Sequence, residues 1–144
     1  MKVLVDTNIF IASMRYVGLK RKLVWKLLEQ DVVVVVTDFI LEELREKFAG
    51  LYQPEEFQAA LDNFLQFLGT GKIEVKIYEA YAPYLNEARV LIVEKDAPIL
   101  AAAMLPDIDY LITRDKRDFL ENPKLQGTPW IKKIKSPQEL LALL

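Results

Sequence analysis

The sequence contains no cysteine and no histidine. These absences exclude disulfide bonds, cysteine-based zinc sites, haem held by histidine and catalysis by a thiol nucleophile. They also exclude Ser-His-Asp triads and hydrolysis in which an imidazole is the general base. If the protein is an enzyme, its chemistry therefore rests on carboxylates, hydroxyl groups, lysine or arginine.

The sequence also lacks long apolar runs and a dominant sign of charge. Its longest apolar runs, such as residues 32–36, have the length of a strand rather than of a membrane span. Asp6 interrupts the first apolar run, which argues against a signal peptide, so we expect a cytoplasmic location and no membrane partner. With 19 Lys and Arg against 21 Asp and Glu, binding to nucleic acid would need a local basic patch or a bound cation.

The 144 residues are 52% hydrophobic and 28% charged, which predicts one globular domain over residues 1–144. Short apolar or alternating segments predict strands, and apolar residues at helical spacing predict helices. Predicted strands cover residues 2–5, 32–36, 73–77, 109–113 and 129–134, and predicted helices cover residues 9–14, 19–30, 38–49, 54–68, 83–93 and 98–104, with a capped Leu-rich turn after residue 136. This alternation predicts an α/β sandwich around a mainly parallel sheet.

Acidic residues recur where predicted strands end and helices begin. Asp6 directly follows the first strand, Asp96 precedes the Ala-rich helix, and Asp115 follows the strand over residues 109–113. Glu43 lies at the edge of an apolar helical stripe, and Asp118 comes one turn after Asp115. Each acid alone is explained as a helix cap or a surface residue. Since parallel strands end at one edge of a sheet, however, the acids are predicted to converge.

Converging carboxylates cannot all stay ionised without a counter-charge, so either some are protonated or a cation binds. Mg²⁺ or Mn²⁺ is the simplest cation, because it takes oxygen ligands, keeps several waters and leaves room for phosphate oxygens. Such a cation lowers the pKa of water and stabilises charge that develops on a phosphodiester. Phosphodiester hydrolysis is therefore compatible with the absence of histidine.

The order and spacing of four segments resemble those of the PIN domain family. The segments are residues 3–10 (VLVDTNIF), 41–44 (LEEL), 96–103 (DAPILAAA) and 111–119 (LITRDKRDF). The resemblance covers essentially the whole chain and implies a three-layer α/β/α fold. It further implies Mg²⁺- or Mn²⁺-dependent endonuclease activity, usually on RNA. In many prokaryotic members it implies the toxin of a toxin–antitoxin pair of the VapBC kind, commonly a homodimer.

The resemblance also assigns roles to individual residues. The catalytic and metal-binding acids that it implies are Asp6, Glu43, Asp96 and Asp115, with Asp118 as a further metal ligand and Asn8 and Thr113 as polar residues that orient the acids. Glu42 adjoins Glu43, so one residue of register decides between them. Pro98 departs from the family pattern, and a tilt of Asp96 away from the other acids would lower the metal affinity.

An acidic nuclease site needs basic residues around it to hold a phosphate backbone. Arg15, Arg114 and Lys116 are the nucleic-acid-binding candidates, because the first follows the opening strand–helix unit and the others flank Asp115. A third basic cluster, Lys132, Lys133 and Lys135, has no evident relation to the site. Tyr16, Trp25, Tyr52 and Trp130 are candidates for stacking on bases, although Trp25 is also interpreted as a core or interface residue.

Two other interpretations remain open. One is a Mg²⁺-dependent phosphatase or phosphotransfer domain, since such domains also place an aspartate after the first strand of a parallel sheet. It fits poorly, because a dehalogenase-like phosphatase needs a second aspartate where Asn8 stands. The other is a non-catalytic relative of the PIN fold that binds nucleic acid or protein, against which the four acids argue.

Overall fold

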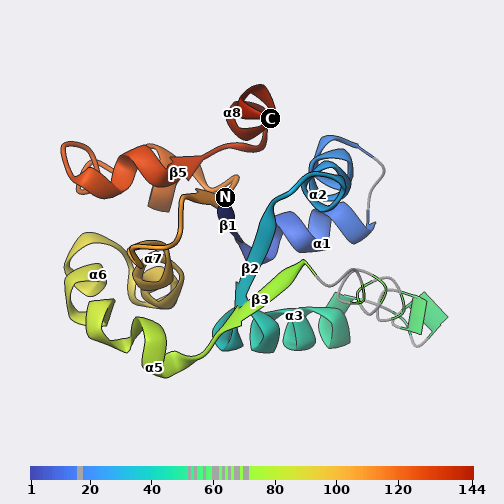
Figure 1. The fold of residues 1–144 in the computed structure, drawn as a ribbon. Helices are drawn as coiled ribbons and strands as arrows, with labels where there is room; N and C mark the ends of the chain where they lie inside the picture. Colours follow the sequence, from blue (N-terminus) through green and yellow to red (C-terminus); the bar gives the residue numbers. More distant parts are fainter. Residues whose placement is uncertain are drawn as a thin grey trace.

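The computed structural model describes residues 1–15, 18–51, 53, 55–56, 58–59, 62, 64, 66, 69 and 72–144. Within these residues, five strands form one sheet in which every neighbouring pair is parallel. The strands are β1 (Lys2–Val5), β2 (Val33–Thr37), β3 (Ile73–Lys76), β4 (Tyr110–Ile112) and β5 (Ile134–Lys135), and they lie in the order β3-β2-β1-β4-β5 (Figure 1). β1 therefore occupies the middle of the sheet.

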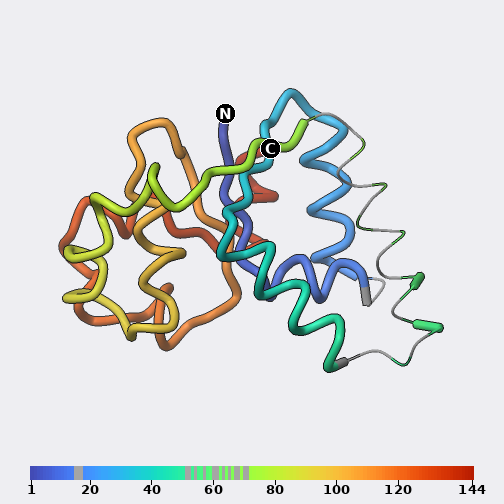
Figure 2. Tube along the Cα trace, turned by 90° about the horizontal axis from the view of Figure 1, so that it is seen from below, coloured from blue at the N-terminus to red at the C-terminus, as the bar shows by residue number. Residues whose placement is uncertain are grey.

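Helices cover both faces of this sheet. On one side lie α1 (Thr7–Arg15), α2 (Leu19–Glu29) and α3 (Asp38–Leu51), and on the other lie α5 (Tyr78–Tyr81), α6 (Leu85–Leu91) and α7 (Ala97–Ala103), as Figures 1 and 2 show. The last helix, α8 (Pro137–Leu143), packs against α2. Shorter helical turns are η1 (Ala82–Tyr84), η2 (Glu94–Asp96), η4 (Pro129–Lys133) and a π-helical turn, η3 (Lys116–Leu120). The molecule is thus the α/β/α sandwich that the sequence predicted.

Two buried elements fix the positions of the acidic residues. β2 contains Val34, Val35 and Val36, none of which has exposed surface, and β-branched side chains suit this extended, doubly covered backbone. In α7, Ala97 and residues 99–103 are at most 2% exposed. The small alanine side chains let α6 and η1 approach α7 closely, and this packing helps to position the start of the helix, next to Asp96.

Several predicted elements are confirmed and two are corrected. The strand expected over 129–134 is wrong, because residues 129–133 form the turn η4, with Pro129 in its first turn, and only Ile134–Lys135 pairs with β4. The helix expected over 83–93 begins earlier, at residue 78, and is divided by η1. Most of the helix expected over 54–68 lies outside the described residues. Pro98 occupies the first turn of α7, where a proline is tolerated, so it does not break this helix.

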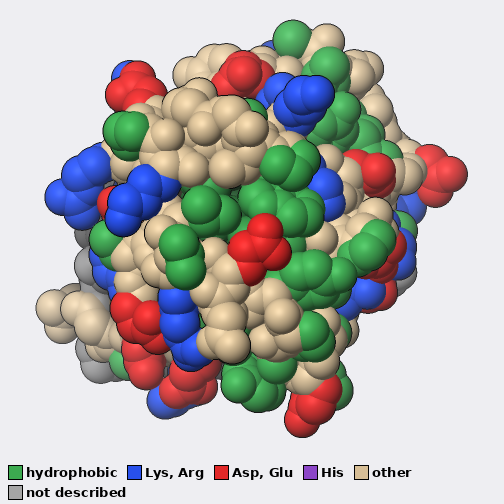
Figure 3. All heavy atoms as spheres, turned by 90° about the vertical axis from the view of Figure 1, so that its left-hand side faces the viewer, with side chains coloured by type: hydrophobic (Ala, Val, Ile, Leu, Met, Phe, Trp, Pro, Cys, Tyr) green, Lys and Arg blue, Asp and Glu red, His purple; other side chains and the backbone are tan. Residues whose placement is uncertain are grey.

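The surface combines apolar and charged groups. Figure 3 shows the side of the molecule on which α6 lies, where hydrophobic side chains alternate with acidic and basic ones.

Trp25 on α2 is 49% exposed, so its interpretation as a core residue is wrong. Across the parts of the chain that the structure describes, no helix combines the length and the hydropathy that a membrane crossing requires.

Candidate metal centre

The order of the strands marks the carboxyl ends of β1 and β4 as the position of a candidate site. From β1 the chain proceeds to β2 and β3 on one side, and later to β4 and β5 on the other, so the winding direction reverses between β1 and β4. In open parallel sheets, ligands bind at such a reversal, beyond the carboxyl ends of the strands. Asp6 directly follows β1 and Asp115 follows β4, so both acids stand at this point.

Asp6 is held in position by hydrogen bonds to the end of β4 and the segment that follows it. Its backbone amide donates to Ile112 O at 3.0 Å, and Thr113 Oγ1 donates to Asp6 Oδ2 at 2.8 Å. The same threonine oxygen accepts from the backbone amide of Asp115 at 3.1 Å. Asp6 is only 4% exposed, and burial raises its pKa, an effect that the Thr113 hydrogen bond opposes. Thr113 thus fixes the relative positions of two predicted acids.

Three further carboxylates form a tight group beside Asp6. One oxygen from each of Asp96, Asp115 and Asp118 lies within 4.8 Å of the others. Asp115 Oδ1 accepts from the backbone amide of Asp118 at 3.0 Å, so Asp115 also caps the turn η3. Arg117 Nε, 3.2 Å from Asp118 Oδ1, holds the pKa of Asp118 below its usual value. This group is acidic but partly neutralised on the side of Arg117.

Asp96 has an unsatisfied oxygen in this group. Its side chain makes no capping hydrogen bond to α7 and is 13% exposed. Oδ2 is buried and, among the described residues, lacks a hydrogen-bond partner, although Lys95 Nζ lies 3.4 Å away as an ion pair. Burial raises the pKa of Asp96 to about 6, while the Lys95 ammonium opposes this shift. A buried polar atom without a hydrogen bond is costly unless it binds another group.

The geometry distinguishes Glu43 from Glu42. Thr7 Oγ1 donates to Glu43 Oε1 at 2.8 Å, and the negative charge of Glu43 contributes to the raised pKa of Asp6. Glu42 instead pairs with Arg45, whose Nε lies 3.2 Å from Glu42 Oε2, on the exposed surface of α3. Glu43 is therefore the acid of this pair that lies toward Asp6.

Two residues near Asp6 were not singled out from the sequence. Thr7 contacts Glu43, whereas Asn8, which was predicted to orient the acids, accepts from Lys47 Nζ at 3.1 Å. Lys47 also lowers the pKa of Asp6 through its charge, which places an ammonium beside this carboxylate. The available signal for Lys47 was its spacing, since it follows Glu43 by four residues and so lies on the same helical face.

These residues fit a divalent cation with a preference for oxygen. The grouped donors are carboxylate oxygens of Asp96, Asp115 and Asp118, and the chain has no cysteine or histidine to add a sulfur or imidazole ligand. The buried Oδ2 of Asp96 lacks a hydrogen bond among the described residues and has the Lys95 ammonium, 3.4 Å away, as an ion-pair partner, so a lone pair remains for a metal cation. The raised pKa values of Asp6 and Asp96 express the cost of burying these charges without such a cation.

The predicted nucleic-acid-binding residues fall into different positions. Arg114 and Lys116 are exposed on either side of Asp115. The side chain of Arg15 lies outside the described part of the structure, as do Tyr16 and Tyr52.

The fold and the acids define a parallel α/β domain with a group of carboxylates where the winding of its sheet reverses. A family model described as "PIN domain" matches residues 2–117, so the chain belongs to the PIN domain family. A search of curated proteins found no match.

Solved structures show the same fold. In the structure of VapBC2 from Rickettsia felis bound to a DNA fragment from their promoter, the matched chain is 19% identical with a TM-score of 0.69, and the match covers 94% of this chain and 98% of that one. For FitAcB from Neisseria gonorrhoeae, the identity is 20% and the TM-score 0.63, with 94% and 98% covered. For a toxin-antitoxin complex from Klebsiella pneumoniae, the values are 19% and 0.63, with 94% and 97% covered.

Proposed function

We propose that this protein is a Mg²⁺- or Mn²⁺-dependent endoribonuclease that hydrolyses RNA phosphodiester bonds. The observation that carries the proposal is the group Asp96, Asp115 and Asp118, in which a buried oxygen of Asp96 has no hydrogen-bond partner among the described residues. Membership of the PIN domain family supports it, because PIN domains are generally nucleases that use divalent metals.

In this proposal the cation is held by Asp6, Glu43, Asp96 and Asp115, with Asp118 as a further ligand. When bound, it would supply a lowered pKa for water and stabilisation of negative charge on the phosphodiester. Thr113 keeps Asp6 in position, and Thr7 does the same for Glu43. The ammonium of Lys95, 3.4 Å from Asp96 and 3.8 Å from Asp118, offsets part of the charge of the acids.

We further propose that the protein is the toxin of a toxin–antitoxin pair, acts in the cytoplasm and forms a homodimer. Support comes from the structural neighbours, which are VapBC2, FitAcB and a toxin-antitoxin complex. An antitoxin or a second copy would need apolar surface to bury. β3 is an edge strand in which Val75 is nearly half exposed, and the adjoining Ile77 and Tyr78 are each more than half exposed.

The proposed activity is tested by incubating the purified protein with mixed RNA in Mg²⁺ or Mn²⁺ and, separately, in EDTA. Asp6→Asn and Asp96→Asn variants are assayed in parallel, and Glu42→Gln is the matched control because Glu42 pairs with Arg45 on the exposed surface of α3. We expect cleavage that needs the metal, disappears in both aspartate variants and persists in the control.

Other results would contradict the proposal. Equal cleavage by every preparation would identify a contaminating nuclease. Absence of cleavage by the folded wild type, together with absence of Mn²⁺ binding in calorimetry, would favour the non-catalytic binding relative. The same assay with single-stranded DNA determines whether the proposed activity is confined to RNA.

A further inference from the structure

A cavity lies between η3 and the corner at which β5 meets α8, at the carboxyl-end side of the sheet on which Asp6 and Asp115 also lie. Its volume is about 590 Å³, and its lining includes Lys116 from η3 and Lys135 from β5. Lys116 directly follows Asp115 in the chain. The backbone amide of Thr113 donates to Lys135 O at 3.0 Å, so Lys135 lies one strand away from the threonine that holds Asp6. The cavity therefore adjoins the candidate metal centre.

Both lysines offer unpaired positive charge to this cavity. Among the described residues, the ammonium of neither Lys116 nor Lys135 makes a hydrogen bond or an ion pair. Two other lysines are engaged: Lys47 Nζ donates to Asn8, and Lys133 Nζ donates to Ala103 O and Leu105 O at the end of α7. Two free ammonium groups on one cavity are suited to bind an anion such as a phosphate.

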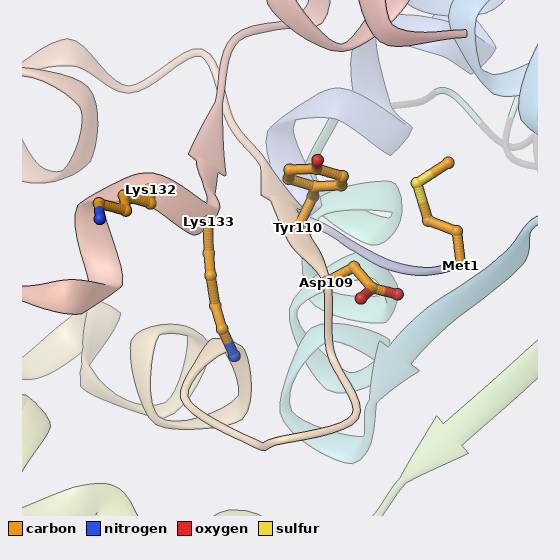
Figure 4. A pocket seen from close by; sticks show the side chains of 5 residues that line it. All are labelled: Met1, Asp109, Tyr110, Lys132 and Lys133. Atoms are coloured by element: carbon orange, nitrogen blue, oxygen red, sulfur yellow. The ribbon is translucent and has the colours of Figure 1, made fainter.

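The basic cluster at residues 132–135 is thus divided between two edges of the sheet. Lys132 and Lys133 line a different pocket, of about 460 Å³, with Met1, Asp109 and Tyr110 (Figure 4). That pocket lies at the amino ends of β1 and β4, and Lys132 and Lys133 point in different directions within it (Figure 4). Lys135, at the end of β5, is the member of the cluster that reaches the side of the acids.

The rest of the lining suits a nucleotide. Leu120, Ile131 and Ile134 provide apolar surface on which a base can rest, and the volume falls within the roughly 300–1,000 Å³ of sites for small organic groups. Two glutamates also contribute. Glu139 is committed to the capping box of α8, where Ser136 N donates to its Oε1 at 3.1 Å, whereas Glu121 is exposed.

We propose that this cavity binds one nucleotide of a single-stranded RNA substrate, adjacent to the phosphate that lies over the acids. Lys116 and Lys135 bind a phosphate of that nucleotide, and the apolar wall contacts its base. The proposal rests on the proposed nuclease function, since it extends the path of the RNA from the acids into the cavity. It assigns a role to Lys135, which the sequence alone did not connect with the site.

The test measures the binding of a short, fluorescein-labelled, single-stranded RNA of mixed sequence by fluorescence anisotropy. Binding is measured in EDTA over a series of salt concentrations, so that metal-dependent cleavage does not compete. The variants are Lys116→Gln and Lys135→Gln, with Lys132→Gln as the matched control because it lies on the other pocket. Glu121→Gln removes negative charge from the cavity instead, and circular dichroism checks that each variant folds.

We expect Lys116→Gln and Lys135→Gln each to weaken binding by roughly 3- to 10-fold and to reduce the slope of log affinity against log salt by about 0.7. Lys132→Gln should bind as the wild type does, and Glu121→Gln should bind more tightly. The two lysine variants should also raise KM for RNA cleavage more than they lower kcat, because they act on binding.

The inference would be overturned if Lys116→Gln and Lys135→Gln both kept the affinity and the salt slope of the wild type. It would also be overturned if Lys132→Gln lost as much RNA affinity as they do, or if the wild type did not bind RNA. If the cavity binds a protein partner instead, the two lysine variants would bind an antitoxin more weakly and RNA as the wild type does. That result would also overturn the inference. The proposed nuclease function fails in a different way, namely as absence of metal-dependent cleavage by a wild type whose RNA binding still depends on both lysines.

Discussion

Replacing Asp96 with asparagine is expected to stabilise the metal-free protein at neutral pH. The ordinary pKa of this carboxyl group is 3.8, and burial raises it to about 6. Because the folded-state pKa is the higher one, this group's contribution to stability is present at low pH and is lost as the pH rises through the interval between the two values. Asparagine has nearly the same shape without the charge, so the variant lacks this loss.

The size of the effect follows from the two pKa values. A difference of roughly 2 units corresponds to about 3 kcal/mol when the group is fully ionised. About 1 kcal/mol of this loss of stability is already present at about pH 4.5, because Asp96 is mostly ionised in the unfolded chain at that pH. The side chain is 13% exposed, so solvent screening removes little. From about pH 4.5 to about pH 7.5, the stability of Asp96→Asn relative to the wild type should therefore grow by about 1–2 kcal/mol.

Urea unfolding in EDTA, followed by tryptophan fluorescence at both pH values, measures this difference. Asp107→Asn is the control with the opposite sign, since hydrogen bonds from Lys76 and Lys2 lower the pKa of Asp107 to about 2. That variant should be less stable than the wild type at neutral pH. Added Mn²⁺ should stabilise the wild type more than Asp96→Asn, because a bound cation favours the folded state. A stability difference for Asp96→Asn that is constant or falls with pH would refute the reasoning.

Three further predictions concern single contacts. Thr113→Val leaves the buried carboxylate of Asp6 without its 2.8 Å hydrogen bond. Urea unfolding should therefore show a free energy of unfolding lower by about 1–3 kcal/mol, and calorimetry a weaker affinity for Mn²⁺. Unchanged values would contradict the role of this contact. Glu43→Gln should abolish RNA cleavage in a gel assay while Glu42→Gln retains it, and the reverse result would assign the site to the other register. Lys133→Met should lower the free energy of unfolding by about 1–2 kcal/mol without affecting RNA binding, because this lysine donates to two carbonyls at the end of α7.

The elements with strong local patterns were predictable from the sequence. The valine run at residues 32–36 predicted β2 to within one residue, because consecutive β-branched residues suit only a buried strand. The final segment was predicted wrongly since apolar residues such as Trp130 and Ile131 occur in both strands and helical turns. Pro129, which suits the first position of a turn, was the signal that favoured η4.

The site was predictable as far as it depends on chain topology. Parallel strands bring Asp6 and Asp115 to one edge, and this follows from the alternation of elements alone. The contacts of Thr7 and Lys47 depend instead on how α1 and α3 pack, and no local pattern records the angle between two helices. The positions of Lys132, Lys133 and Lys135 at two edges of the sheet depend likewise on the turn η4, where the sequence predicted a strand.

The hydrogen bond between Thr113 and Asp6 joins residues that are 107 positions apart in the chain. During synthesis, Asp6 therefore has no Thr113 to bind until most of the protein has been translated. A chain that stops before β4 carries Asp6, Glu43 and Asp96 but not Asp115 or Asp118, so it has an incomplete set of acids. The order of the strands thereby delays assembly of the acidic centre until late in translation, and unfinished chains remain without it.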